Sequence, residues 1–167
     1  RLGQFGIYQE AGEVIEEIIK AAVTLSARKA GALIAIEREA GLKTYIESGV
    51  VLDSNVAEDI IVSIFMPQAP LHDGALIIRN NRIAAAGCLL PLTQETNIAK
   101  ALGTRHRAAI GLTEETDAAC VVVSEETGAI SIAVGGKLMQ NLEEEEAKKR
   151  LKDIFYRPAR GGRKKVA

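Results

Sequence analysis

The chain has 167 residues, of which 47% are hydrophobic and 26% charged, so it has enough apolar side chains for a buried core and is not of the disordered class. Its 21 Lys and Arg balance 22 Asp and Glu, and only 4% of the residues are aromatic, which argues against a nucleic-acid partner. No apolar run approaches the ~18 residues that a membrane helix needs. Cys88 and Cys120 lie in apolar runs without disulfide or zinc spacing, so we expect two reduced core residues.

The first half of the chain shows helical and strand patterns in turn. Apolar residues at helical spacing predict a helix over Gly12–Lys29, and the run Ala32–Ile36 is typical of a buried strand. A loop over 66–74 contains Pro67 and Pro70, which no regular element crosses easily. The other elements expected here are short strands at 44–49 and 50–52 and a helix through Ile60 and Phe65, capped by Asp53 or Ser54.

The second half predicts two hairpins and a closing helix. Two apolar runs on either side of Asn80-Asn81 form the first hairpin. The other expected elements are a helical stretch at 97–102, strands at 118–124 and 129–134 that Gly135-Gly136 closes, and a helix from Glu143. The expected fold class is α/β, with a mixed, mostly antiparallel central sheet of about six or seven strands flanked by helices. We expect one domain over 1–156 and a basic, disordered tail over 157–167.

The loop before the first hairpin carries the first candidate site. Asp73 follows His72 directly and precedes a continuous apolar run, and Gly74 allows a close approach of backbone or ligand. A neighbouring carboxylate and imidazole suit a divalent metal that also contacts phosphate oxygens. The alternative is an ordinary Asp-Gly turn beside a hydrogen-bonded histidine.

The second candidate site is the segment Gly103-Thr104-Arg105-His106-Arg107. A Gly-Thr entry to a helix exposes backbone N–H groups, and Thr104 is a candidate cap or phosphate ligand. The planar guanidinium of arginine pairs well with phosphate oxygens. The alternative is a surface turn whose arginines form salt bridges.

The third candidate site is the segment Ser124-Glu125-Glu126-Thr127-Gly128, which follows a very apolar strand. Taken alone it reads as a hairpin turn with solvated acids. Together the three sites supply a carboxylate for a metal, an Arg/Thr phosphate clamp, and a hydroxyl and acid at a strand end, which indicates phosphoryl or nucleotidyl transfer. No P-loop and no kinase-type glycine loop is present in the sequence.

These stretches resemble the diadenylate cyclase (DAC) domain family, whose members condense two ATP molecules into cyclic di-AMP. The family's signature tripeptides stand here as Asp73-Gly74-Ala75, within PLHDGALI, and Arg105-His106-Arg107, within LGTRHRAAIG. The resemblance continues through Gly31–Ile34, IAAAGCLLPLT and VSEETGAISIA, and so covers about residues 13–140. It implies the DAC-domain fold and the activity of a nucleotidyltransferase.

The resemblance also implies a role for each matching residue. Asp73 is implied to bind the catalytic metal and to help activate the ribose 3′-hydroxyl, with His72 and Glu126 as further metal ligands. The triphosphate is implied to lie on Arg105, His106 and Arg107. The other implied ATP-binding residues are Leu33, Gly74, Ala75, Leu89, Gly103, Thr104 and Ser124. Leu89 stands where relatives often have a tyrosine, so a stacking contact with adenine worth ~1 kcal/mol is lost.

The implied cofactor is Mn²⁺ or Mg²⁺, and in some members Co²⁺. Because cyclic di-AMP has two equivalent links, the reaction implies a face-to-face homodimer in which each copy holds one ATP. The segment RKAGALIAIERE resembles the membrane-associated bacterial type, which implies a parent protein at the cytoplasmic face of the cell membrane, transmembrane helices outside this chain, and room for a regulatory protein partner. The alternatives are an inactive nucleotide-binding sensor and a metal-dependent phosphohydrolase.

Overall fold

The computed structural model describes residues 4–100 and 102–156, and the side chains of 10–100 and 102–156. Its described part contains a seven-stranded sheet in the order β2-β4-β3-β1-β5-β6-β7. The strands are β1 (Ala32–Ile36), β2 (Val50–Asn55), β3 (Ala75–Arg79), β4 (Arg82–Cys88), β5 (Ala119–Val123), β6 (Ile130–Val134) and β7 (Lys137–Met139). Only β1 and β3 pair in parallel; the other neighbouring pairs are antiparallel. The predicted fold class is confirmed.

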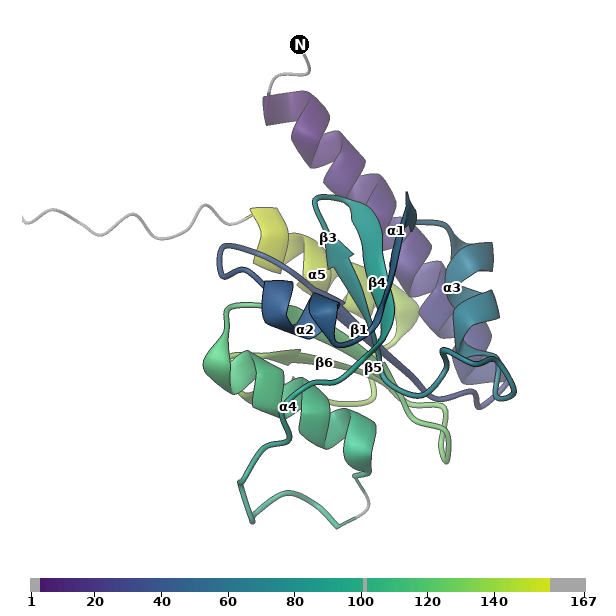
Figure 1. Cartoon of the computed structure of the whole chain (residues 1–167), viewed down its shortest axis with the longest axis vertical. Helices are drawn as coiled ribbons and strands as arrows, with labels where there is room; N and C mark the ends of the chain where they lie inside the picture. The colour runs from purple at the N-terminus through teal and green to yellow at the C-terminus, as the bar shows by residue number, and fades with distance from the viewer. Residues whose placement is uncertain (1–3, 101, 157–167) are drawn as a thin grey trace, which may run out of the picture.

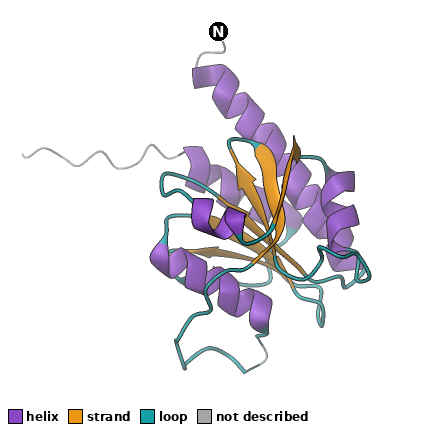
Figure 2. Ribbon diagram, viewed as in Figure 1, coloured by secondary structure: helices purple, strands orange, loops and turns teal. Residues whose placement is uncertain are grey.

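Helices cover both faces of this sheet (Figure 1). The helices are α1 (Gln4–Ala27), α2 (Lys43–Glu47), α3 (Glu58–Phe65), α4 (Thr104–Glu115) and α5 (Glu144–Tyr156). Helices α1, α3 and α5 pack on one face and α2 and α4 on the other, which gives three layers (Figure 2). No helix of the described residues has the length and apolar character to cross a membrane. The expected tail over 157–167 lies outside the described residues.

The central strand β1 shows why the sheet needs two cores. All five of its residues are buried, and successive side chains of a strand point to opposite faces. Ala32, Ile34 and Ile36 pack with α1, α3 and α5, whereas Leu33 and Ala35 pack with α2 and α4. The continuous apolar run that predicted a buried strand therefore reflects burial on both sides.

Helix α1 supplies much of the first core, and Leu25 near its C-terminal end is fully buried there. Replacing Leu25 by Ala is expected to lower the free energy of unfolding by about 2–5 kcal/mol, because it removes buried methyl groups and leaves a cavity. Urea denaturation monitored by circular dichroism measures this change, and Glu13→Ala on the exposed face of α1 is the control. A loss below ~1 kcal/mol would show that α1 does not pack on the sheet in solution.

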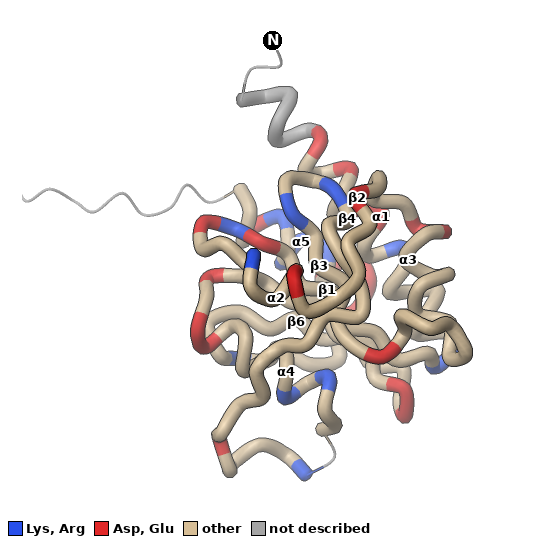
Figure 3. The backbone as a smooth tube through the Cα atoms, viewed as in Figure 1, with Lys and Arg blue, Asp and Glu red and all other residues tan. Residues whose placement is uncertain are grey.

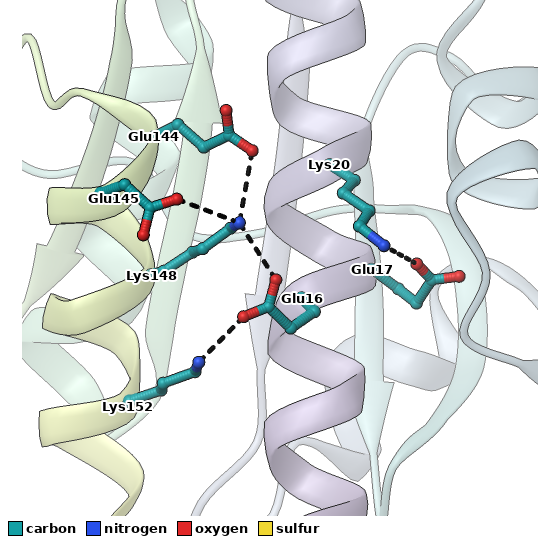
Figure 4. Close-up of polar contacts among 7 residues, drawn as sticks. All are labelled: Glu16, Glu17, Lys20, Glu144, Glu145, Lys148 and Lys152. Carbon is teal, nitrogen blue, oxygen red and sulfur yellow. Dashed lines mark hydrogen bonds and ion pairs between the residues drawn. The ribbon is translucent and has the colours of Figure 1, made fainter.

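Ion pairs join the outer faces of α1 and α5 (Figure 4). The Lys152 Nζ donates to Glu16 at 2.9 Å, and the Lys148 Nζ lies 3.1 Å from the other oxygen of the same carboxylate. These lysines hold the pKa of Glu16 below its usual value, with the hydrogen bond from Lys152 as the largest cause. The hydrogen bond to Glu16 is the largest cause of a raised pKa of Lys148, and those to Glu144 and Glu145 on α5 act in the same direction. The network thus links α5 to α1 at the surface, above the core that the two helices share.

Both predicted hairpins, β3–β4 and β5–β6, are confirmed, and a further strand, β7, pairs with β6. Asn80 and Asn81 have φ angles of 50° and 60°, as a two-residue hairpin turn of this hand requires. Gly135 and Gly136 also have positive φ angles, 58° and 78°, but they connect β6 to a further strand, β7, rather than ending the pair.

Two expectations in the first half of the chain are wrong. The expected strand at 44–49 is helix α2, because Leu42 and Ile46, four residues apart, are both buried on the same face of the sheet. Asp53 and Ser54 lie in β2 instead of capping a helix. Arg82 Nε donates to Asp53 at 2.7 Å across the irregular β2–β4 pairing, and α3 begins three residues after that strand.

The expected helix at 97–102 is also wrong: residues 97–100 and 102 are not helical, and residue 101 is not described. The Leu102 N–H donates to Ala99 at 3.0 Å, as in a single turn. This stretch has almost no buried side chain, so it lacks the apolar face that stabilises a helix.

Candidate functional site

One end of the sheet brings together three segments that are far apart in the sequence. In the pairing, Ala32 at the start of β1 lies opposite Val123 at the end of β5, and Ala75 at the start of β3 lies opposite Cys88 at the end of β4. A cavity of about 670 Å³ opens there. It is lined by Leu33, His72, Asp73, Gly74, Cys88, Leu89, Leu90, Leu92, Gly103, Thr104, Arg105, His106, Ala108, Val123, Ser124, Glu125 and Glu126. All three polar segments singled out in the sequence contribute to this list.

The loop before β3 presents Asp73 to the cavity. The Asp73 side chain is exposed, and no hydrogen bond or ion pair holds it within the described part of the chain. Gly74 follows with a φ angle of 118°, and a Cβ there would lie 2.8 Å from the carbonyl carbon of Gly87. The close approach of β3 and β4 thus requires glycine at this position.

His72 is oriented by a hydrogen bond within the same loop. Its Nδ1 lies 2.7 Å from the carbonyl oxygen of Ala69, which can only accept, so Nδ1 carries the proton. The lone pair of Nε2 is then available to a metal ion, and a histidine ligand is commonly held in this way. Asp73 and His72 can therefore supply a carboxylate and an imidazole nitrogen as ligands to a metal ion.

Arg105, in the first turn of α4, is poorly satisfied in the free protein. Its Nε is buried and has no hydrogen-bond partner among the described residues. Its Nη1 lies 3.6 Å from a carboxylate oxygen of Glu125, which is an ion pair without hydrogen-bond geometry. The guanidinium lies against Gly31, where an added Cβ would be 2.5 Å from Nη1. A buried donor without a partner is costly, so this side chain is well suited to receive an anion.

The start of α4 adds backbone donors to this anion site. Gly103, not Thr104, is the N-cap residue, and no side chain caps the helix, so the expectation that Thr104 is the cap is wrong. Both residues line the cavity. The N–H groups of a first helical turn have no partner within the helix, and they favour negative charge. Figure 3 shows basic residues at this end of α4.

Not every residue of the two signature tripeptides, 73–75 and 105–107, lines the cavity. His106 lines the cavity, but it is buried, and desolvation followed by the charge of Arg105 lowers the pKa of its imidazole. It is therefore a neutral ring near pH 7. Arg107 is half-buried outside the cavity lining, and Ala75 is fully buried in the core beside α4. The structure does not bring these last two side chains into the cavity.

The turn after β5 closes the cavity on its polar side. The Ser124 hydroxyl accepts N–H groups from Glu126 and Thr127, both at 3.3 Å. The Ser26 hydroxyl at the end of α1 donates to the carbonyl oxygen of Gly128 and so holds the far side of the turn. Ser124, Glu125 and Glu126 are thereby presented to the cavity by a fixed backbone.

The cavity also has apolar lining residues, several of which were not predicted from the sequence. Cys88, Leu90, Leu92, Ala108 and Val123 join the predicted Leu33 and Leu89 there. Leu89 is 72% exposed at the rim, and its backbone N–H donates to Ser48 at 2.9 Å. Burial raises the pKa of the Cys88 thiol to about 11, so it is an inert part of the lining rather than a nucleophile. Strand and helix spacing alone could have indicated Cys88 and Ala108.

The donor set fits a metal ion that arrives with phosphate. Among the described residues, no group of three or more His, Cys, Asp and Glu side chains forms a metal centre by itself. Mg²⁺ is usually held by one or two protein ligands together with substrate phosphates and water. The unpartnered carboxylate of Asp73 and the oriented nitrogen of His72 match that arrangement, and Glu126 lines the same cavity.

Comparison with known proteins identifies similar chains. A family model named DAC, described as "DisA bacterial checkpoint controller nucleotide-binding", matches residues 19–138. The chain is 47% identical over 148 residues to the cyclic di-AMP synthase CdaA of Bacillus subtilis, which covers 89% of this chain and 54% of that protein. It is 46% identical over 143 residues to a diadenylate cyclase of Listeria monocytogenes, and the match covers 86% of this chain and 52% of that protein. The chain thus spans about half the length of these curated relatives.

Two solved structures have the same fold. A double mutant of DacA from Staphylococcus aureus superposes with a TM-score of 0.85 at 43% identity, covering 89% of this chain and 99% of that one. A hypothetical membrane spanning protein from Bacillus cereus superposes with a TM-score of 0.73 at 48% identity, covering 76% of this chain and 62% of that one.

Proposed function

The chain belongs to the DAC family of nucleotide-binding domains, and from this premise we propose that it is a diadenylate cyclase that condenses two ATP molecules into cyclic di-AMP and two pyrophosphates. The observation that carries the proposal is the convergence of Asp73 and Arg105 on one cavity. Curated relatives with the names cyclic di-AMP synthase and diadenylate cyclase, at 46–47% identity, support it.

The cavity has the size and the polarity for one ATP. Its volume of about 670 Å³ lies in the usual range of small-molecule sites. The triphosphate lies, in this proposal, on Arg105 and the first turn of α4, and the base lies against the apolar lining residues Leu33 and Leu90. The ribose then lies between them, near Asp73.

The proposed reaction forms one bond and breaks one bond at each α-phosphorus. The ribose 3′-oxygen attacks the α-phosphorus in line, its proton passes to the Asp73 carboxylate or to water, and pyrophosphate leaves with the electron pair of the broken bond. Arg105 and the backbone N–H groups of α4 stabilise the negative charge on the phosphates. Asp73 and His72, with Glu126 nearby, would hold a divalent ion, which would supply Lewis-acid stabilisation of the same charge.

Two copies of the chain are needed because the product has two equivalent links. Each ATP must act once as nucleophile and once as electrophile, so we propose a face-to-face pair related by a twofold axis. The exposure of Asp73, Glu125 and Glu126 supports this proposal, since a partner's nucleotide can reach them. The name of the Bacillus cereus neighbour further supports a parent protein associated with the bacterial membrane through segments outside this chain.

Incubation with ATP and Mn²⁺ or Mg²⁺, followed by chromatography of the nucleotides, tests the proposal. We expect cyclic di-AMP and pyrophosphate in a ratio of one to two. Unchanged ATP would favour a nucleotide-binding sensor, and ADP or AMP without cyclic di-AMP would favour a phosphohydrolase; either result would overturn the proposal.

Gly31 offers a test of how Arg105 is positioned. A methyl group at Gly31 would lie 2.5 Å from Nη1 of Arg105, so the guanidinium must move away from β1. Gly31→Ala is expected to reduce kcat/KM by about 10- to 100-fold, because a misplacement of the order of 1 Å is sufficient for such a loss. Steady-state kinetics measures this, with Gly41→Ala, where an added Cβ meets no atom within 4 Å, as the control. Full activity of Gly31→Ala would argue against this placement of Arg105.

A further inference from the structure

Glu125 is the one acid of the turn after β5 that contacts a basic residue of the cavity. Its carboxylate lies 3.6 Å from Nη1 of Arg105, and it is the only ion-pair partner that the described part of the chain gives this arginine. The Glu125 side chain is 65% exposed and that of Arg105 only 21%. The anion is therefore the movable member of the pair and the guanidinium the fixed one.

The backbone beneath Glu125 is firmly held. The Gly128 N–H donates to the Ser124 carbonyl at 2.9 Å, and the Ala129 N–H donates to the Thr127 hydroxyl at 3.1 Å. The Ser26 hydroxyl fixes the Gly128 carbonyl from α1. Glu125 can thus leave Arg105 by side-chain rotation alone, without unfolding the turn.

The pair leaves much of the hydrogen-bonding capacity of Arg105 unused. Its Nε is buried without a partner, and the Nη1 contact is longer than a hydrogen bond. Phosphate oxygens match the planar fork of a guanidinium and form short, charge-assisted hydrogen bonds with it. A phosphate ligand would therefore form the stronger contact and displace the carboxylate.

We propose that Glu125 is a positioning residue that occupies Arg105 as an internal anion in the free protein and yields it to the triphosphate of the nucleotide. This inference rests on the proposed function, because it assigns the phosphates of ATP to Arg105. Glu125 competes with the substrate before binding and with pyrophosphate after reaction. It keeps the guanidinium in place over Gly31 before the nucleotide binds. Because it competes for Arg105, it also lowers the affinity for phosphate ligands and so accelerates product release.

Equilibrium binding of α,β-methylene-ATP, in which the α–β bridge does not cleave, measures this competition without turnover. Isothermal titration calorimetry in Mg²⁺ should show that Glu125→Gln lowers Kd by about two- to fivefold, as expected for the loss of an exposed ion pair. Glu114→Gln removes the same charge from the other end of α4 and should leave Kd unchanged. The KM for ATP should fall in the same proportion as Kd.

A double-mutant cycle shows whether the effect passes through Arg105. In the Arg105→Ala background, Glu125→Gln should leave Kd unchanged, because the pair no longer exists. An equal decrease of Kd in both backgrounds would mean general charge repulsion and would overturn the proposal. Weaker binding by Glu125→Gln in Mg²⁺ but not in EDTA would make Glu125 a metal ligand and would also overturn it.

The two proposals fail in different ways. Unchanged affinity in Glu125→Gln together with normal cyclic di-AMP synthesis would contradict the role of Glu125 alone. Tighter analogue binding by Glu125→Gln, together with no cyclic di-AMP from the wild-type chain, would contradict the cyclase proposal alone. A wild-type chain that does not bind the analogue would contradict both.

Discussion

Replacing Asp73 by Asn is expected to reduce cyclic di-AMP synthesis by about 10²- to 10⁴-fold, the usual contribution of a group that handles the proton of the nucleophile. An amide of the same shape neither accepts that proton nor supplies a charged oxygen to a metal ion. Asp73 has no hydrogen bond or ion pair within the described residues, so the fold should not depend on its charge. Initial rates by chromatography and melting by circular dichroism measure both expectations.

The matched control for Asp73→Asn is Asp153→Asn, which removes one exposed carboxylate from α5. It should retain the wild-type rate. An Asp73→Asn variant that remains fully active would remove Asp73 from the chemistry, whereas one that loses activity together with its melting transition would show that the residue is structural.

Replacing Arg105 by Ala is expected to reduce kcat/KM by about 10²- to 10³-fold, as for the loss of one preorganised donor to developing charge. The reason is the state of this side chain, whose buried Nε has no partner and whose guanidinium faces the cavity from the first turn of α4. Arg105→Lys should recover part of the loss, because it restores the charge but not the planar fork.

Arg150→Ala is the control for Arg105→Ala, since Arg150 is half exposed and, among the described residues, pairs only with Glu146 on α5. It should leave kcat/KM unchanged. Titration of α,β-methylene-ATP distinguishes binding from chemistry: unchanged affinity in Arg105→Ala would contradict the assignment of Arg105 to the triphosphate.

The larger elements of the fold could be predicted because their patterns are unambiguous. Asn80-Asn81 between two apolar runs predicted a type of hairpin turn that the φ angles confirm. Helix α2 could not be predicted, because its five residues include β-branched and aromatic side chains, and only the packing of Ile46 against the sheet decides in favour of a helix. Tertiary contacts outweigh local preference in so short a segment.

The site could be predicted only as separate pieces. Local motifs indicated Asp73 and Arg105, but their convergence depends on the parallel pairing of β1 with β3 and the antiparallel pairing of β1 with β5. The motifs also carried Arg107, which lies about 200° around the helix from Arg105 and therefore points elsewhere. Glu125 belongs to the third candidate segment, but no role could be predicted for it, because an exposed acid in a turn has no distinctive pattern; only its distance to Arg105 identifies one.

The dependence of specific activity on protein concentration tests most directly that the reaction needs two copies of this chain. Rates of cyclic di-AMP formation at saturating ATP are measured across a dilution series, while analytical ultracentrifugation gives the fraction of dimer in each sample. The account predicts that specific activity falls with the dimer fraction, so that the rate rises more steeply than linearly with concentration. A constant specific activity in samples that sediment as monomers would contradict it.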